Sequence, residues 1–141
     1  MVQSAYASAL KAPVENEEFP PKAGGSAARK INAAPDERPL ELCEGMIDIA
    51  AALFGVSGKE LRRPGRTAND VARIRQIAMY VAHVALRLTM TDIGRGFGRD
   101  RTTVVHSCHL IEDLRDDDDF DRIVAMTERV ALAAFRERLG L

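Results

Sequence analysis

The fold is decided by one stretch of the sequence, Thr89-Met90-Thr91-Asp92-Ile93-Gly94-Arg95-Gly96-Phe97-Gly98-Arg99-Asp100-Arg101-Thr102-Thr103-Val104-Val105-His106. Its pattern predicts a helix, a tight glycine turn and a second helix, with cationic and hydroxyl side chains at the start of the second helix. A helix-turn-helix presents its recognition helix to the major groove of DNA in this way. We therefore expect a helix-turn-helix that reads double-stranded DNA.

Helical periodicity continues on both sides of this stretch. The expected helices run over residues 40–55, 57–61, 67–88, 89–97, 100–114 and 120–139. Apolar side chains recur at the 3.6-residue period within each of the longer segments. The sequence thus predicts an all-α domain of about six helices over residues 39–141, ending in an acidic helix.

Start signals support these boundaries. Ser57-Gly58-Lys59-Glu60 is a capping box, and Thr67 to Asp70 resembles a second one. Thr89 and Asp100 are the expected caps of the two helices of the helix-turn-helix.

The periodicity also predicts which side of each helix is buried. The expected buried stripes are Leu42, Met46, Ile49, Ala50 and Leu53; Val71, Ile74, Ile77, Ala78, Val81, Val84 and Ala85; Val104, Cys108 and Ile111; and Ile123, Met126, Val130 and Ala134. On the helix from 100 to 114, Thr102, His106 and His109 lie opposite the buried stripe.

Residues 1–38 differ in composition from the rest. They are rich in proline, alanine and glycine and show no sustained hydrophobic period, although a short helix over residues 4–10 is compatible with the sequence. Such a segment buries too little apolar surface to offset its ordering entropy. We expect a disordered tail.

The charge is unevenly distributed. The net charge is −1, but Lys59 to Arg101 contains ten Lys/Arg against four Asp/Glu, whereas the part from Glu112 onward contains five against nine. Phosphate binding depends on local patches rather than on totals. The middle of the chain is the expected DNA-facing side.

The start of the recognition helix offers several candidate contacts. Arg101 can reach a guanine edge or a phosphate, and Thr102 and Thr103 can donate to phosphates, touch a thymine methyl or simply cap the helix. Asp100 can accept from a cytosine amino group or serve only as a cap. His106 lies on the same face.

Two further basic groups flank this unit. Arg62, Arg63 and Arg66 form a basic turn that can reach the DNA backbone or minor groove, or can be a solvated loop. Arg75 and the adjacent Gln76, with Arg73, can add phosphate contacts or be surface residues.

Catalytic and metal signatures are lacking in the sequence. It has neither a phosphate-binding loop of the G-x-x-x-x-G-K-[ST] type nor a G-x-S-x-G elbow, so we expect no enzyme activity, no nucleotide binding and no cofactor. His106 and His109 have a spacing that metal ligands use but lack further ligands, and we predict no metal site. Cys43 and Cys108 are expected to be buried free thiols.

The sequence also lacks a signal peptide and an apolar run long enough for a membrane span. We expect no membrane association. The predicted location is the cytoplasm, in association with the nucleoid.

The blocks Val71 to Tyr80, Asp92-Ile93-Gly94 and Gly98 to His106 together resemble the C-terminal DNA-binding domain of the bacterial replication initiator DnaA, over roughly Leu40 to Leu114. The resemblance implies that the recognition helix binds the initiator box in the major groove while a basic loop enters the minor groove. Three differences stand out: a single Gly98 where the family usually has two glycines, Arg101 in place of histidine, and Ile74 where many members have proline.

By position, the resemblance assigns base and phosphate contacts to Asp100, Arg101, Thr102 and Thr103. The resemblance also assigns backbone contacts to Arg75 and Gln76, and a minor-groove contact to an arginine of residues 62–66. The neighbouring Arg99 and His106 are further candidate DNA contacts.

The initiator's ATPase module has no counterpart in the sequence. This favours a reader of initiator-like boxes that regulates replication initiation or transcription without ATP hydrolysis. The alternative is a protein–protein adaptor that acts on the replication initiator or its regulators and has little DNA affinity.

Overall fold

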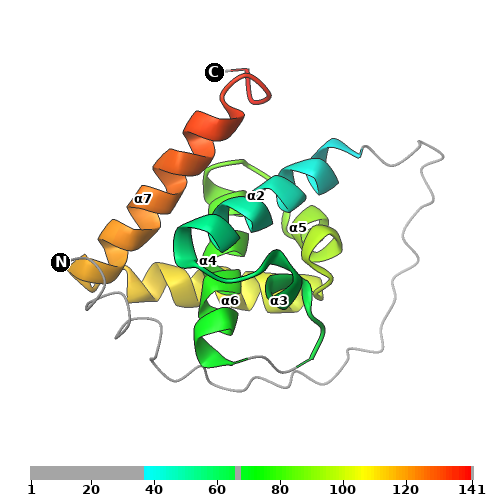
Figure 1. Ribbon diagram of the computed structural model, residues 1–141. Helices are drawn as coiled ribbons and strands as arrows, with labels where there is room; N and C mark the ends of the chain where they lie inside the picture. Colours follow the sequence, from blue (N-terminus) through cyan, green and yellow to red (C-terminus); the bar gives the residue numbers. More distant parts are fainter. Residues whose placement is uncertain (1–36, 66–67, 141) are drawn as a thin grey trace.

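The computed structural model describes residues 37–65 and 68–140, which form a bundle of six helices (Figure 1). The helices are α2 (Arg38–Phe54), α3 (Gly58–Arg62), α4 (Asn69–Val84), α5 (Met90–Phe97), α6 (Arg101–Leu114) and α7 (Asp118–Phe135). No strand occurs in this described part. The all-α prediction and the helix-turn-helix formed by α5 and α6 are confirmed. The expectations for residues 1–36, and for Arg66 and Thr67, lie outside the described residues.

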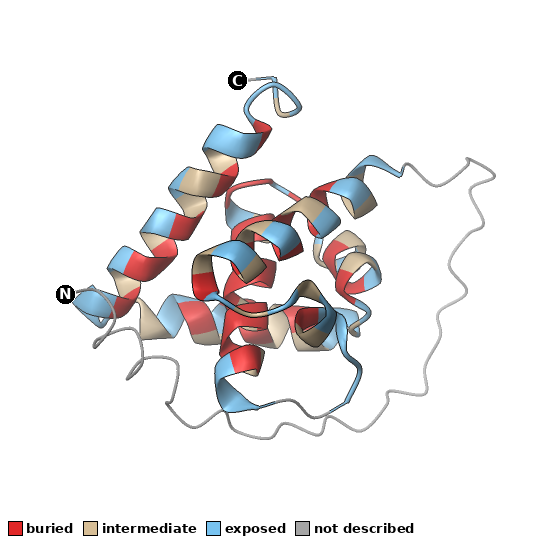
Figure 2. Ribbon diagram, viewed as in Figure 1, coloured by how far each residue is buried: buried red, intermediate tan, exposed pale blue. Residues whose placement is uncertain are grey.

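Helix α4 is the centre of the core. It packs against all five other helices, and its residues from Val71 to Ala82 are almost all buried (Figure 2). Helices α2 and α6 make the most extensive contacts with α4, and α5 packs against α2, α6 and α4. The helix-turn-helix is thus mounted on a rigid, fully packed support.

Side-chain caps fix the starts of three helices. Ser57 Oγ accepts a hydrogen bond from Glu60 N at 3.1 Å, and Thr89 Oγ1 accepts one from Asp92 N at 3.1 Å, as predicted. Asp117 caps α7 through Phe120 N at 2.9 Å. Asp100 occupies the N-cap position of α6, but its side chain makes no cap hydrogen bond, which corrects the predicted capping role.

Helix α4 ends four residues earlier than predicted. Arg87 adopts a left-handed conformation with φ of 60°, and His83 Nδ1 lies 2.9 Å from the carbonyl oxygen of Leu88. These features form a tight connection to α5, in which Leu88 N donates to Ala82 O at 3.1 Å. Val84, predicted to be buried, consequently lies at the end of the helix with 44% of its surface exposed.

The buried faces of α2 and α7 are rotated relative to the prediction. In α7, Met126 is 37% exposed and Ala134 is also exposed, whereas the buried side chains are Phe120, Ile123, Val124, Thr127, Ala131 and Phe135. Two neighbouring faces of α7 carry apolar side chains at helical spacing. The face with Phe120 and Phe135 is the buried one, because the two phenylalanines bury the larger apolar area. In α2, Cys43, Ile47 and Phe54 are buried, while Ile49 and Leu53 are half-buried.

Arg115 links α7 to the helix-turn-helix through hydrogen bonds and ion pairs, and we call this cluster the arginine hub. Arg115, which follows α6, donates to Asp121 Oδ1 at 2.6 Å, to Tyr80 Oη at 3.1 Å and to Glu128 Oε1. Tyr80 in turn donates to Glu112. Burial alone would lower the pKa of Arg115, yet these hydrogen bonds and the Glu128 charge raise it above its usual range. The hub ties α4, α6 and α7 together.

Cys43 and Cys108 are buried free thiols, as expected. Within the described residues, none of the helices is both long enough and apolar enough to cross a membrane.

Candidate nucleic-acid interface

The turn between α5 and α6 is tight because two glycines allow it. Gly98 ends α5 in a left-handed conformation with φ of 65°, and its N–H donates to the carbonyl oxygen of Gly94. At Gly94 an added Cβ would lie 2.6 Å from the carbonyl oxygen of Arg99 and 3.5 Å from Arg101 N. The backbone of the turn therefore rests directly on α5, which fixes where α6 begins.

The first residues of α6 project from the surface. Arg101 and Thr102 are exposed, Asp100 is exposed beside them, and Thr103 is half-buried. The side chain of Asp100 is not used for capping, so its carboxylate can accept a hydrogen bond from a ligand. A guanidinium, a hydroxyl and a carboxylate therefore stand together at the end of α6 that also carries the positive helix dipole.

The outer face of α6 continues along the helix. His106 is half-buried and His109 is exposed, whereas Val104, Cys108 and Ile111 face the core as predicted. Within residues 37–65 and 68–140, no three His, Cys, Asp or Glu side chains are grouped so as to hold a metal ion.

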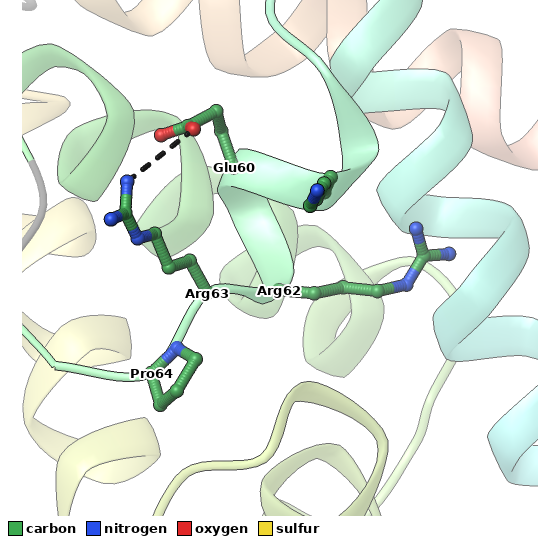
Figure 3. Close-up of a pocket in the computed structure, with 5 residues that line it drawn as sticks. Glu60, Arg62, Arg63 and Pro64 are labelled. Atoms are coloured by element: carbon green, nitrogen blue, oxygen red, sulfur yellow. Dashed lines mark ion pairs between the residues drawn. The ribbon is translucent and has the colours of Figure 1, made fainter.

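A basic segment, Lys59 to Pro64, lies at the end of α3. An open hollow of about 530 Å³ is lined by Lys59, Glu60, Arg62, Arg63 and Pro64 of this segment. The side chains of Arg62 and Arg63 point to opposite sides (Figure 3). Arg63 pairs with Glu60 at 3.6 Å and Arg62 with Asp48 at 3.8 Å. Both pairs are exposed, and such pairs contribute about 0–1 kcal/mol, so a phosphate can replace either acid at little cost.

Lys59 was missed as a candidate residue. It is exposed and lines the same hollow as Arg62 and Arg63. The signal was available, because the basic stretch of the sequence begins at Lys59.

The predicted phosphate contact Arg75 lies inside the protein. It is only 6% exposed, and it donates from Nε to Leu61 O at 2.8 Å and from Nη2 to Glu60 O at 3.3 Å. Burial, and to a smaller extent the charge of Arg99, lower its pKa to about 10, although the charge of Glu60 acts in the opposite direction. In this structure Arg75 anchors the end of α3 to α4.

Arg73 and Gln76, the neighbours of Arg75 in α4, are also less exposed than surface residues would be. Arg73 is 1% exposed and donates from Nη1 to Gln76 Oε1 at 2.9 Å. Gln76 is half-buried. Their arrangement stabilises the first turns of α4 and presents little of either side chain to a ligand.

Arg99 connects the turn to the basic segment. Its Nη2 donates to the carbonyl oxygen of Arg63 at 2.7 Å, across 36 residues of sequence. Burial lowers its pKa. The structure therefore brings together the start of α6 and the basic segment on one edge, while Arg66 of the predicted loop lies outside the described residues.

The other end of α6 is acidic. Glu112 and Asp113 are exposed near its last turn, and Asp116 to Asp119 are exposed just beyond it, where α7 begins (Figure 1). The recognition helix is thus basic at its start and flanked by carboxylates at its end.

Residues 43–111 match the family model described as the bacterial DnaA protein helix-turn-helix. A chromosomal replication initiator protein DnaA from Lachnoclostridium phytofermentans is 33% identical over 99 residues, which cover 69% of this chain and 22% of that protein. The DnaA protein of Rhodopseudomonas palustris strain TIE-1 is 42% identical over 81 residues, covering 57% of this chain and 17% of that protein. The chain therefore spans about a fifth of the length of these relatives.

A solved structure described as a DNA replication initiation factor has a similar fold. The TM-score is 0.62 with 23% sequence identity, and the match covers 68% of this chain and 30% of that one. The helical arrangement is therefore shared with that protein.

Proposed function

Residues 43–111 belong to the bacterial DnaA helix-turn-helix family, and from this premise we propose that the chain binds double-stranded DNA with a preference for initiator-box-like sequences. The observation that carries the proposal is the exposed cluster of Asp100, Arg101 and Thr102 at the start of α6, beside the basic segment. An α-helix that enters the major groove by its N-terminal residues needs such side chains there.

Each side chain of this cluster has a role in base reading. Arg101 donates to a guanine edge, or to a phosphate where no guanine is in reach. Asp100 accepts from a cytosine amino group, and Thr102 contacts a thymine methyl or a phosphate. Thr103 and His106, which are half-buried, contribute contacts at the flank of the helix.

The basic segment grips the DNA backbone or the minor groove. Lys59, Arg62 and Arg63 are exposed, and Asp48 and Glu60 hold Arg62 and Arg63 only weakly. Side chains of this type supply phosphate contacts, which position the protein without reading sequence, and arginines also enter narrow minor grooves. Arg66 belongs to the same proposal on the basis of the sequence. Arg75 and Arg99 support this surface from behind through hydrogen bonds to backbone carbonyls, and Gln76 accepts a hydrogen bond from Arg73 within α4.

In the cell, the chain regulates replication initiation or transcription at such sites, in association with the nucleoid. The matched part corresponds to the helix-turn-helix of the initiator, and the activity proposed for it is binding rather than ATP hydrolysis. Incubation with ATP should therefore change neither the DNA affinity nor the phosphate concentration.

A second candidate function is that of an adaptor for the initiator or its regulators. The exposed carboxylates of Asp116 to Asp119 favour it, because they offer a charged surface away from the start of α6. An adaptor of this kind would show little affinity for DNA.

The test is fluorescence anisotropy with the purified full chain, an initiator-box duplex and a scrambled duplex over a series of salt concentrations. A tenfold preference for the box, about 1.4 kcal/mol, supports the proposal when Arg101→Ala removes it. Each phosphate contact should add roughly 0.9 to the slope of log affinity against log salt. Equal, salt-sensitive binding to both duplexes would support the proposed DNA binding but contradict the proposed preference for the initiator box. Absence of binding at low salt would leave the adaptor.

A further inference from the structure

Two arginines from different elements hold the end of α3. Arg75 of α4 donates to the carbonyl oxygens of Glu60 and Leu61, and Arg99 of the α5–α6 turn donates to that of Arg63. Backbone carbonyls at the end of a helix lack most of their intrahelical partners. These bonds supply donors to the carbonyls of Leu61 and Arg63 and add a second donor to that of Glu60, which also accepts from Arg63 N at 3.3 Å. The basic segment is therefore connected both to the core helix and to the recognition helix.

The Arg99 end of this connection is itself rigid. Arg99 N donates to Gly94 O at 2.9 Å, and its carbonyl oxygen lies against the Cα of Gly94, where a Cβ would be 2.6 Å away. Asp100 and Arg101 follow directly along the chain. A displacement of the Arg99 backbone would therefore move the residues that begin α6.

We infer that Arg99 is a positioning residue that sets the spacing between the basic segment and the start of α6, so that both surfaces meet one DNA duplex as a single rigid unit. The inference rests on the proposed function. It assigns the Arg99 guanidinium to the Arg63 carbonyl rather than to a base or a phosphate. Holding both surfaces in their bound arrangement before contact reduces the ordering cost of binding.

This role has a distinctive consequence for sequence preference. Loss of the Arg99 hydrogen bond should weaken discrimination at the base pairs that lie under the basic segment, although Arg99 touches none of them. Discrimination at the base pairs read by α6 should persist. A residue that only stabilised the fold would weaken both groups of base pairs equally.

The experiment first selects the preferred site of the wild-type chain from random duplex DNA. Arg62→Ala and Arg63→Ala then identify the base pairs that depend on the basic segment, and Arg101→Ala identifies those that depend on α6. Arg99→Met, which keeps chain length but removes the donor, should reduce discrimination in the first group by roughly fivefold, the equivalent of one net hydrogen bond. Arg95→Met is the matched control, because Arg95 is an exposed arginine of α5 that pairs with Asp92 of its own helix at 3.7 Å. It should change neither group.

Amide hydrogen exchange on the DNA-free chain provides a second readout. Arg99→Met should speed exchange at the end of α3 by roughly fivefold, and Arg95→Met should leave it unchanged. Unchanged exchange at α3 would overturn the inference. So would a uniform loss of affinity with a salt slope lower by about 0.9, since that result identifies a phosphate contact. If the wild type selects no sequence, the proposed function fails, and the exchange result alone decides whether Arg99 holds the segment.

Discussion

Gly94→Ala is the substitution that tests the helix-turn-helix geometry most directly. The new Cβ would lie 2.6 Å from the carbonyl oxygen of Arg99, and ordinary contact at about 3.5 Å requires a shift of about 0.9 Å. The obstacle is backbone on a tight turn, so it has little freedom to move aside. Overpacking of this kind costs roughly 3 kcal/mol at the upper end of its range, while replacing glycine by alanine in a helix returns about 1 kcal/mol.

The expected net loss is therefore about 2 kcal/mol of unfolding free energy, or a Tm lower by roughly 8–16 °C for a domain of this size. Thermal and urea unfolding, followed by circular dichroism, measure it. Because α6 is displaced, affinity for a preferred DNA site should also fall at temperatures where the variant is folded.

Gly98→Ala is the control. A Cβ at Gly98 meets nothing within 4 Å, but its φ of 65° is unfavourable for alanine, so a loss of roughly 1–2 kcal/mol is expected with little change in DNA affinity. If Gly94→Ala proves as stable as the wild type, the close approach of the turn to α5 does not exist and the reasoning is refuted.

Three further results are expected. Lys59→Ala should weaken binding to all duplexes alike and lower the salt slope by about 0.9; a loss confined to one sequence would contradict a backbone role for the exposed Lys59. Arg115→Met should lower the unfolding free energy by about 2–4 kcal/mol, because it leaves the partly buried carboxylates of Asp121 and Glu128 unpaired, and urea unfolding of this variant beside Arg122→Met, an exposed arginine of α7, measures the difference. Burial, with a smaller effect of the Asp92 charge, raises the pKa of Cys43 to about 12, and burial raises that of Cys108 to about 11. Both thiols should therefore resist alkylation by iodoacetamide at pH 8 until urea is added, and rapid alkylation of the native chain would disprove the burial. The unfolding free energy should decline as pH rises from about 9 toward 12, because the unfolded chain releases these thiol protons at lower pH than the folded chain does.

Local signals in the sequence were sufficient to predict the helices and two of their side-chain caps, but not the absence of a cap hydrogen bond from Asp100. Ser57 and Thr89 cap as predicted because a capping hydrogen bond involves only neighbouring residues. The end of α4 was not predictable in the same way. It depends on the left-handed backbone conformation of Arg87 and on the contact between His83 and the Leu88 carbonyl oxygen. Neither an arginine nor a histidine in the sequence predicts these features.

The orientation of side chains across elements was harder to predict. In α7, the periodicity allowed two stripes, and only packing against the rest of the bundle selects the one with Phe120 and Phe135. Phe135, for example, lies where a Cβ on Gly45 of α2 would clash with its ring. Sequence patterns within one helix carry no information about such a partner.

In the candidate interface as well, the sequence predicted exposure correctly for some residues and not for others. Arg101 and Thr102 are exposed at the start of α6, where the position in the helix alone placed them. Arg75 has the same side chain as Arg101 but points into the protein, because carbonyl groups of the preceding helix α3 lie within its reach. An arginine in a sequence identifies a cation; the tertiary structure decides whether it faces a ligand or a carbonyl.

The exposed carboxylates beyond the end of α6 and the exposed Arg101 at its start give the chain an uneven distribution of charge, although its formal net charge is only −1. At distances beyond the Debye length of about 8 Å, a duplex exerts little force on a chain whose formal charge is −1. Closer in, the field of the phosphates exerts a torque that turns the Arg101 end toward the DNA and the Asp116–Asp119 end away from it. The rotation narrows the range of orientations in which first contact occurs, and it turns the start of α6 toward the duplex, the orientation that the proposed binding requires.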